Sequence, residues 1–215
     1  MTTYFVTGID TNIGKTYATA FLVNHFKERF PTQSVITQKL IQTGNTGISE
    51  DIKKHRQLTN TPLTQSDKHG ITCPYVLSTP ASPHLASQID NVIIDTNHIT
   101  HCTHLLTQQY DTILLEGAGG VFVPLTNDLL TLDYVATLGY PVIVVTCGRL
   151  GSINHTLLTL EAINNRGLSV YALVYNPYFD DPQISGSTQQ YLKAHLSKHF
   201  CNALWLDMPI YPQHL

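Results

Sequence analysis

The stretch VTGIDTNIGKTYAT, residues 6–19, decides the fold of this chain. It ends in the Gly-Lys-Thr of a nucleotide-binding loop, but five residues separate Gly8 from Gly14, whereas a standard phosphate-binding loop has four. A predicted strand precedes it and a helical pattern follows it, so backbone N–H groups and a positive helix end face one point. The alternative is a strand-to-helix turn with a coincidental Gly-Lys-Thr. The context favours a phosphate-binding loop with one extra residue.

The rest of the chain alternates short apolar runs with helical patterns. Stripes spaced i, i+3, i+4 predict helices over 18–26 and 153–160, the second with Ser152 as N-cap and Gly167 as C-terminal stop. Each apolar run is apolar on successive residues, as in parallel strands buried on both faces: 4–7, 34–37, 112–115, 142–146, 170–175 and 203–206. We predict one α/β domain over residues 1–215, with a mainly parallel sheet, helices on both faces and a P-loop NTPase fold.

Residues 43–90 interrupt this alternation, being polar, rich in Thr and Pro, and without a clear strand. We expect an excursion that carries side chains to a site, although a tolerated surface insertion would have the same composition.

Composition excludes several functions. The 12 Lys and Arg residues against 15 Asp and Glu residues give a net charge of −3 without a long basic run, which argues against a nucleic-acid partner. Apolar runs stay far below the roughly 20 residues of a membrane helix, so no membrane partner is expected. The chain opens directly into a strand, and its four scattered cysteines suit a reducing compartment. We expect a cytoplasmic protein.

Polar residues follow three of the predicted strands. Lys39 comes just beyond the second strand, Glu116 ends the third, and Asn176 ends the fifth. Ligands of open α/β sheets bind outside the carboxyl ends of the strands, so these side chains would face the nucleotide. A solvated strand end and a turn carboxylate are the ordinary alternatives for Lys39 and Glu116. Their conjunction favours a site for phosphoryl transfer.

The order and spacing of the loop at 8–16, Lys39, EGAGG at 116–120 and Asn176 closely resemble dethiobiotin synthetases, the ATP-dependent enzymes of biotin synthesis. PASPHLA at 80–86 and RLGSINHTLLTLEAI at 149–163 also look like family segments. Family members typically carry G-T-D-T-x-x-G-K-T, which has the same five residues between its glycines. This chain departs from the family at Ile9, usually Thr, at Leu40, usually Pro, and in its early end at Leu215.

The resemblance implies a reaction in three steps that consumes ATP and uses Mg²⁺. One amine of 7,8-diaminononanoate captures CO₂ as a carbamate, ATP phosphorylates the carbamate, and the second amine closes the ring of dethiobiotin. The catalytic residues would be Lys15 and Lys39, bracketing the γ-phosphate and the carbamate. The implied metal ligands are Thr16, Asp51 and Glu116, with Glu50 an alternative to Asp51.

The resemblance also assigns the remaining contacts. The implied ATP-binding residues are Asn12, Ile13, Gly14, Lys15, Thr16, Tyr17, Asp51, Glu116, Gly117, Ala118, Gly119, Asn176, Pro177, Pro209, Ile210 and Tyr211. The implied substrate-binding residues are Thr11, Lys39, Thr43, Ser82, Pro83, Gly120, Gly151, Ser152, Ile153 and Asn154. The family works as a homodimer that holds the substrate carboxylate at a helix N-terminus of the partner chain, here residues 151–154. An ordinary Ser-capped helix is the alternative for that segment.

Other patterns point to rival functions. His98, His101 and His104 lie beside Cys102, but steps of three drift around a helix, which disfavours zinc. Partitioning ATPases usually carry a second Lys two residues after the first loop Gly, where this chain has Asp10. Cobyrinate-type synthases normally add a glutamine-using domain, for which this chain is too short. The sequence therefore favours a ligase.

Overall fold

The computed structural model describes residues 1–211 and centres on a six-stranded parallel sheet in the order β2-β5-β1-β6-β7-β8. The strands are β1 (Thr2–Gly8), β2 (Val35–Lys39), β5 (Thr112–Glu116), β6 (Val142–Cys147), β7 (Val170–Asn176) and β8 (Leu204–Asp207). Every residue of β5 and β6 is buried, which requires cover on both faces. The predicted α/β fold and all six predicted strands are thus confirmed.

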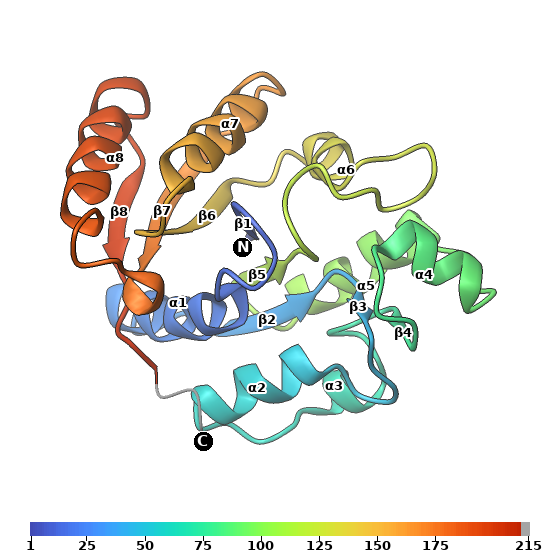
Figure 1. The fold of residues 1–215 in the computed structure, drawn as a ribbon. Helices are drawn as coiled ribbons and strands as arrows, with labels where there is room; N and C mark the ends of the chain where they lie inside the picture. The colour runs from blue at the N-terminus through green and yellow to red at the C-terminus, as the bar shows by residue number, and fades with distance from the viewer. Residues whose placement is uncertain (212–215) are drawn as a thin grey trace.

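The main helices are α1 (Lys15–Arg29), α5 (Thr96–Thr107), α6 (Thr131–Leu138), α7 (Ser152–Asn164) and α8 (Ser185–His199). α1 packs against β2 and β5, while α7 packs against β6 and α8. Figure 1 shows α7 and α8 together at the β7–β8 end of the sheet, and α4 (Pro83–Ile89) with β3 (Gln42–Thr43) and β4 (Val76–Leu77) at the opposite side. None of the helices in residues 1–211 combines the length and apolarity needed to cross a bilayer.

The expectation that residues 43–90 lack strands was wrong. A second, two-stranded parallel sheet pairs β3 (Gln42–Thr43) with β4 (Val76–Leu77), and α4 (Pro83–Ile89) packs against it. Two further helices lie between β3 and β4 along the chain: α2 (Glu50–Leu58) and α3 (Gln65–Lys68). Strands of two residues leave no periodicity to read. Capping bonds define the short helices, since Ser49 accepts from the Ile52 N–H and Thr64 forms a reciprocal capping box with Asp67.

The two ends of α7 give different results. The predicted N-cap Ser152 is wrong because Gly151 occupies that position with φ 91°, and the Ser152 hydroxyl lies buried 3.2 Å from the Cys147 Sγ. The predicted stop at Gly167 is confirmed. Its N–H donates to the Asn164 carbonyl at 2.9 Å and the Leu168 N–H donates to the Ile163 carbonyl at 3.3 Å, the paired bonds of a glycine-closed helix.

A buried ion pair joins α2 to α3. The Arg56 guanidinium donates to both carboxylate oxygens of Asp67, at 2.9 and 2.8 Å, and the Thr72 hydroxyl donates to the same carboxylate at 2.7 Å. Arg56 is 6% exposed and Asp67 is 3% exposed. Burial alone would raise the pKa of Asp67, but the hydrogen bonds from Arg56 and from the Thr64 N–H hold that pKa below its ordinary value.

We expect Asp67→Asn to lower the free energy of unfolding by about 3 kcal/mol, because it leaves the Arg56 charge buried without a partner. Denaturant unfolding at pH 7 measures the loss, and Lys68→Ala, an exposed neighbour, should change it by less than about 0.5 kcal/mol. The pKa of Asp67 is lower in the folded protein than in the unfolded chain. The stability difference between wild type and Asp67→Asn is therefore largest above the ordinary aspartate pKa, and it decreases as the pH falls through the pKa of the folded state. Equal losses in both variants would contradict the assignment.

Candidate active site

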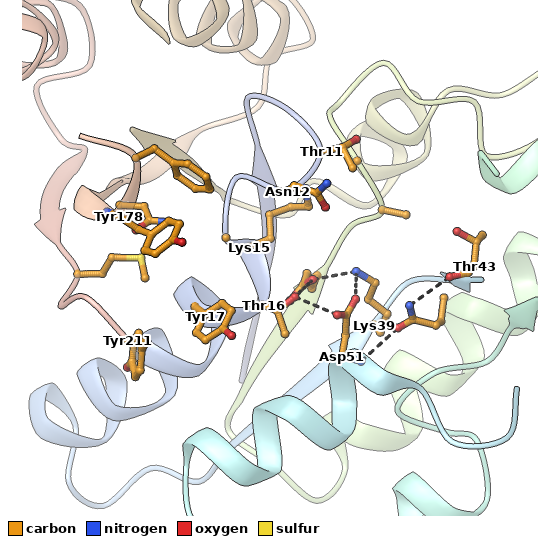
Figure 2. A pocket seen from close by; sticks show the side chains of 18 of the residues that line it. Thr11, Asn12, Lys15, Thr16, Tyr17, Lys39, Thr43, Asp51, Tyr178 and Tyr211 are labelled. Atoms are coloured by element: carbon orange, nitrogen blue, oxygen red, sulfur yellow. Dashed lines mark hydrogen bonds and ion pairs between the residues drawn. The ribbon is translucent and has the colours of Figure 1, made fainter. Parts of the chain in front are cut away.

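A cavity of about 530 Å³ opens at the carboxyl ends of the sheet strands, beside the loop that joins β1 to α1. It lies where the strand order reverses around β1, the usual ligand site of such sheets. The predicted site residues that line it are Thr11, Asn12, Gly14, Lys15, Thr16, Tyr17, Lys39, Thr43, Asp51, Glu116, Ala118, Gly119, Asn176 and Tyr211 (Figure 2). The structure thus gathers residues from the whole chain at one place.

The loop at 8–14 curls around its own lysine. Asn12 and Gly14 take left-handed conformations, with φ 57° and 92°, and α1 begins at Lys15. The Lys15 ammonium donates to the Asp10 carbonyl at 2.9 Å. Lys15 is only 7% exposed, and burial, followed by the nearby charge of Lys39, lowers its pKa to about 8. The loop thus holds the Lys15 ammonium at the N-terminus of α1, where the positive end of the helix dipole also favours a phosphate.

Lys39 is the centre of a compact ionic cluster. Its ammonium lies 2.6 Å from an Asp51 carboxylate oxygen and 2.8 Å from the Glu116 Oε1 (Figure 2). The register of the sheet explains the second contact, since Lys39 and Glu116 are direct partners at the ends of β2 and β5. Burial alone would lower the pKa of Lys39, but the two carboxylates raise it above its ordinary value. Lys39 is therefore charged.

The same cluster gathers three oxygen donors. The Thr16 hydroxyl lies 3.0 Å from the Asp51 Oδ1 and 3.3 Å from the Glu116 Oε1. Hydroxyl and carboxylate oxygens are the ligands that Mg²⁺ prefers, so the donor set fits this ion. Asp51 lines the cavity, whereas Glu50 is exposed and does not line it. Of the two alternatives for the acidic residue, the structure places Asp51 in the cavity.

The second oxygen of Glu116 has two partners that sequence reasoning missed. The Glu116 Oε2 lies 2.8 Å from the His55 Nε2 and accepts from the Thr19 hydroxyl at 2.8 Å. Burial alone would raise the pKa of Glu116, but Lys39 and His55 hold it well below its ordinary range. His55 and Asp51 lie one turn apart on α2, a spacing that shares a helix face. That signal requires a helix at 50–58, and a short helix with an acidic start was only the alternative interpretation of Asp51 in the sequence.

The far end of the cavity is aromatic. Tyr17, Tyr178 and Tyr211 line it, and the rings of Tyr17 and Tyr211 lie 5.7 Å apart (Figure 2). The Asn176 side chain donates to the Ile13 carbonyl at 2.9 Å and accepts from the Tyr178 N–H at 3.1 Å. An aromatic wall beside a phosphate-binding loop suits a nucleoside base. The lining residues that the sequence did not single out are Ile41, Gln42, Tyr178, Phe179 and Met208.

Twelve predicted residues do not line this cavity: Ile13, Ser82, Pro83, Gly117, Gly120, Gly151, Ser152, Ile153, Asn154, Pro177, Pro209 and Ile210. Ile13 and Gly117 are nevertheless bonded to lining residues, since the Ile13 carbonyl accepts from the Asn176 side chain at 2.9 Å and the Gly117 carbonyl accepts from the Lys39 ammonium at 3.1 Å. Ser82 and Pro83 begin α4, and residues 151–154 begin α7. These two helix starts form no part of the cavity wall within one chain.

The segment before α7 nevertheless contacts the phosphate loop. The Arg149 guanidinium pairs with the Asp10 carboxylate and lies 5.9 Å from the centre of the Phe179 ring. Asp10 is the position at which partitioning ATPases usually carry lysine. Here an acidic residue fills it and is bound within the chain.

The histidine-rich segment on α5 lies apart from the cavity. The His98 Nε2 is 3.9 Å from the Cys102 Sγ, and the His104 Nε2 is 3.3 Å from the Gln108 amide nitrogen. Within residues 1–211, no group of three or more His, Cys, Asp or Glu side chains is placed to hold a metal ion.

Comparison with known proteins identifies the family. Residues 2–212 match the AAA domain family. The chain is 49% identical over 208 residues to the ATP-dependent dethiobiotin synthetase BioD 2 of Pasteurella multocida, covering 96% of this chain and 97% of that protein. The chain belongs to the dethiobiotin synthetase family. The Haemophilus ducreyi dethiobiotin synthetase is 48% identical over 95% of this chain and 96% of its own length.

Solved structures support the fold of this dethiobiotin synthetase family member. A ParA family ATPase from Chlorobium tepidum superposes with a TM-score of 0.54 at 14% identity, covering 98% of this chain and 85% of that one. The MinC:MinD complex of Aquifex aeolicus gives a TM-score of 0.55 at 12% identity over 99% of this chain and 83% of that chain. At these identities the likeness extends to the fold alone.

One departure from the usual dethiobiotin synthetase sequence has a structural role. Leu40 stands where the family usually carries proline, and its N–H donates to the Glu116 carbonyl at 2.8 Å. Proline has no N–H, so a proline at position 40 could not make this bond between the ends of β2 and β5. A second departure, Ile9, is buried in the hydrophobic core. Both changes leave the charged groups of the cavity in place.

We expect Gly14→Ala to destabilise the protein more than Gly47→Ala. Both glycines have positive φ, 92° and 74°, so each alanine carries a backbone strain of about 1–2 kcal/mol. A side chain on Gly14 would also come within 2.4 Å of the Asn176 amide nitrogen, whereas Gly47 has open space. Thermal unfolding of the two variants measures the difference, and equal melting temperatures would show that the contact between Gly14 and Asn176 is unimportant.

Proposed function

We propose that this protein catalyses the ATP-dependent synthesis of dethiobiotin from 7,8-diaminononanoate and CO₂ in biotin biosynthesis. The observation that best supports this function is that two ammonium groups, those of Lys15 and Lys39, line one cavity together with three oxygen donors: Thr16, Asp51 and Glu116. Relatives that share close to half of its residues over nearly the whole chain are ATP-dependent dethiobiotin synthetases. The reaction is a ligation that forms C–N bonds and releases ADP and phosphate.

Three bond-forming steps complete the reaction. One amine nitrogen of the diamine attacks the carbon of CO₂ and loses a proton, which gives a carbamate. A carbamate oxygen then attacks the γ-phosphorus of ATP, and ADP leaves as the bond to the bridging oxygen breaks. Finally the second amine attacks the carbamoyl carbon of this carbamic-phosphoric anhydride, the C–O bond to the phosphate breaks, and the ring closes as phosphate leaves and the amine nitrogen loses a proton. Each step needs positioned cations more than a covalent intermediate on the protein.

The ammonium groups serve the charge that develops in the second step. Lys15 donates to a loop carbonyl in the structure, so phosphate oxygens would replace a single neutral acceptor. Lys39 sits against two carboxylates and would neutralise the carbamate and the transferring phosphoryl group from the other side. Thr16, Asp51 and Glu116 would hold Mg²⁺, which when bound supplies charge neutralisation to the phosphate oxygens.

The aromatic wall and the loop would orient the nucleotide. Tyr17, Tyr178 and Tyr211 offer faces for a base, with Asn176 at the loop between base and phosphates. A nucleotide held at both ends keeps its γ-phosphate in line with the attacking oxygen. The substrate would lie toward Thr11 and Thr43, the lining residues on the other side of the ionic cluster (Figure 2).

The main test mixes purified protein with the diamine, bicarbonate, Mg²⁺ and ATP, and follows the cyclic urea by mass spectrometry. We expect Lys39→Met to lower kcat/KM by roughly 10³, because removing one group that stabilises developing charge has effects of this size. Lys53→Met, an exposed lysine on α2, should leave the rate unchanged.

Phosphate release without the diamine, and no cyclic urea with it, would instead indicate an ATPase that drives a conformational switch. The fold alone is compatible with that activity, because the ParA and MinD structures share it. Partitioning ATPases usually carry a lysine at the position of Asp10, which here pairs with Arg149. This difference favours a ligase over a switch ATPase.

We also propose that the protein works as a homodimer whose partner chain supplies the N-terminus of α7 to the substrate. Residues 151–154 do not line the cavity of their own chain, and the adjacent Leu150 is 88% exposed. Gly151 is exposed and a side chain there would meet nothing within 4 Å, so the start of α7 is open to an approaching carboxylate. In such a dimer, residues 151–154 would contact the substrate bound in the cavity of the partner chain.

We expect sedimentation to give twice the 23.9 kDa mass of one chain. Leu150→Glu should shift the protein toward the monomer and raise the KM for the diamine more than that for ATP, because the variant removes the partner's helix from the substrate. A wild-type protein that sediments as a monomer while making dethiobiotin would contradict the dimer and leave the activity intact.

A further inference from the structure

A chain of buried hydrogen bonds runs from the ion pair between α2 and α3 to the carboxylate of the proposed metal site. The Arg56 guanidinium donates to the Thr37 hydroxyl at 2.8 Å, that hydroxyl lies 3.1 Å from the His55 Nδ1, and the His55 Nε2 lies 2.8 Å from the Glu116 Oε2. Thr37 and His55 are completely buried and Glu116 is 1% exposed. Water therefore does not compete for these bonds.

The chemistry of the two end groups, a guanidinium and a carboxylate, fixes the direction of the two bonds that they make in this chain. Arginine has only donors, so the Thr37 oxygen must accept from Arg56. The Thr37 oxygen also lies 3.1 Å from the His55 Nδ1, and a hydroxyl can donate to that nitrogen or accept from it. The His55 Nε2 carries a hydrogen and donates it to Glu116, because a carboxylate can only accept. Asp67 holds Arg56 in place at the other end of the chain.

We infer that His55 is a positioning residue that turns the Glu116 carboxylate toward the metal site, with Thr37 and Arg56 holding the His55 ring in place at its Nδ1 side. With Thr19, His55 occupies Oε2, so Oε1 is the oxygen that faces Thr16 and Lys39. A carboxylate fixed at one oxygen keeps the other in a defined place, and loss of such an outer partner typically lowers metal affinity 10–100-fold.

The inference rests on the proposed function, since it concerns the site that would hold the magnesium nucleotide. The readout is metal-dependent affinity rather than turnover. Calorimetry measures the ATP affinity of each variant with Mg²⁺ and again with EDTA, and the ratio of the two values reports how well the protein's own ligands hold the metal. A purely structural role would lower both affinities together and leave the ratio unchanged.

We expect His55→Leu to lower this ratio at least about 10-fold while its ATP affinity in EDTA changes less than about twofold. His55→Gln should restore most of the ratio because its amide nitrogen can occupy the place of the Nε2, whereas His55→Asn should not, because its amide ends at the place of the Nδ1. Ile52→Ala, a fully buried position on the same helix, should reduce thermal stability and keep the wild-type ratio.

Three outcomes decide the matter. A wild-type ratio in His55→Leu, or equal ratios in the glutamine and asparagine variants, would overturn the role of His55 and leave the proposed activity standing. If the leucine variant fails to fold, the comparison of glutamine with asparagine still decides. A wild-type protein without any Mg²⁺ enhancement of ATP binding would overturn the metal site itself, and the inference with it.

Discussion

The ion pair between Lys39 and Glu116 is the contact on which the site depends. Both side chains are nearly inaccessible to water, and either charge alone would be strongly disfavoured there. The pair exists because two neighbouring parallel strands end in register, with Lys39 opposite Glu116. The charged residues at the carboxyl ends of β2 and β5 are therefore buried with the rest of the sheet and are not exposed on its edge.

Around this pair the opposite charges are matched. Lys39 contacts Asp51 as well as Glu116, and Lys15 lies near enough for Lys39 to lower its pKa. Such an arrangement favours ligands that bring both signs of charge together, an anionic nucleotide with a divalent cation. A lone anion would gain from the ammonium groups but would meet two carboxylates, and a lone cation would compete with Lys39.

The sequence predicted the parts of the molecule that local patterns control. Six strands were readable because each is apolar on successive residues, and Lys39, Glu116 and Asn176 could be placed because they follow those strands directly. His55 and Tyr178 could not be found in the same way. His55 depends on a nine-residue helix defined by a cap, and Tyr178 on a single 3-10 turn, η1 (Pro177–Phe179). Ser152 was misassigned because a glycine with positive φ took the capping position.

The Asn176 amide lies so close to Gly14 that the side chains allowed at these two positions, far apart in the sequence, depend on each other. The amide of Asn176 reaches the Ile13 carbonyl across the space that a side chain at residue 14 would fill. A carboxylate at 176 would turn an acceptor toward the Ile13 carbonyl, which is itself an acceptor. The missing side chain of the glycine is therefore what leaves room for the amide that fastens the loop to the end of β7.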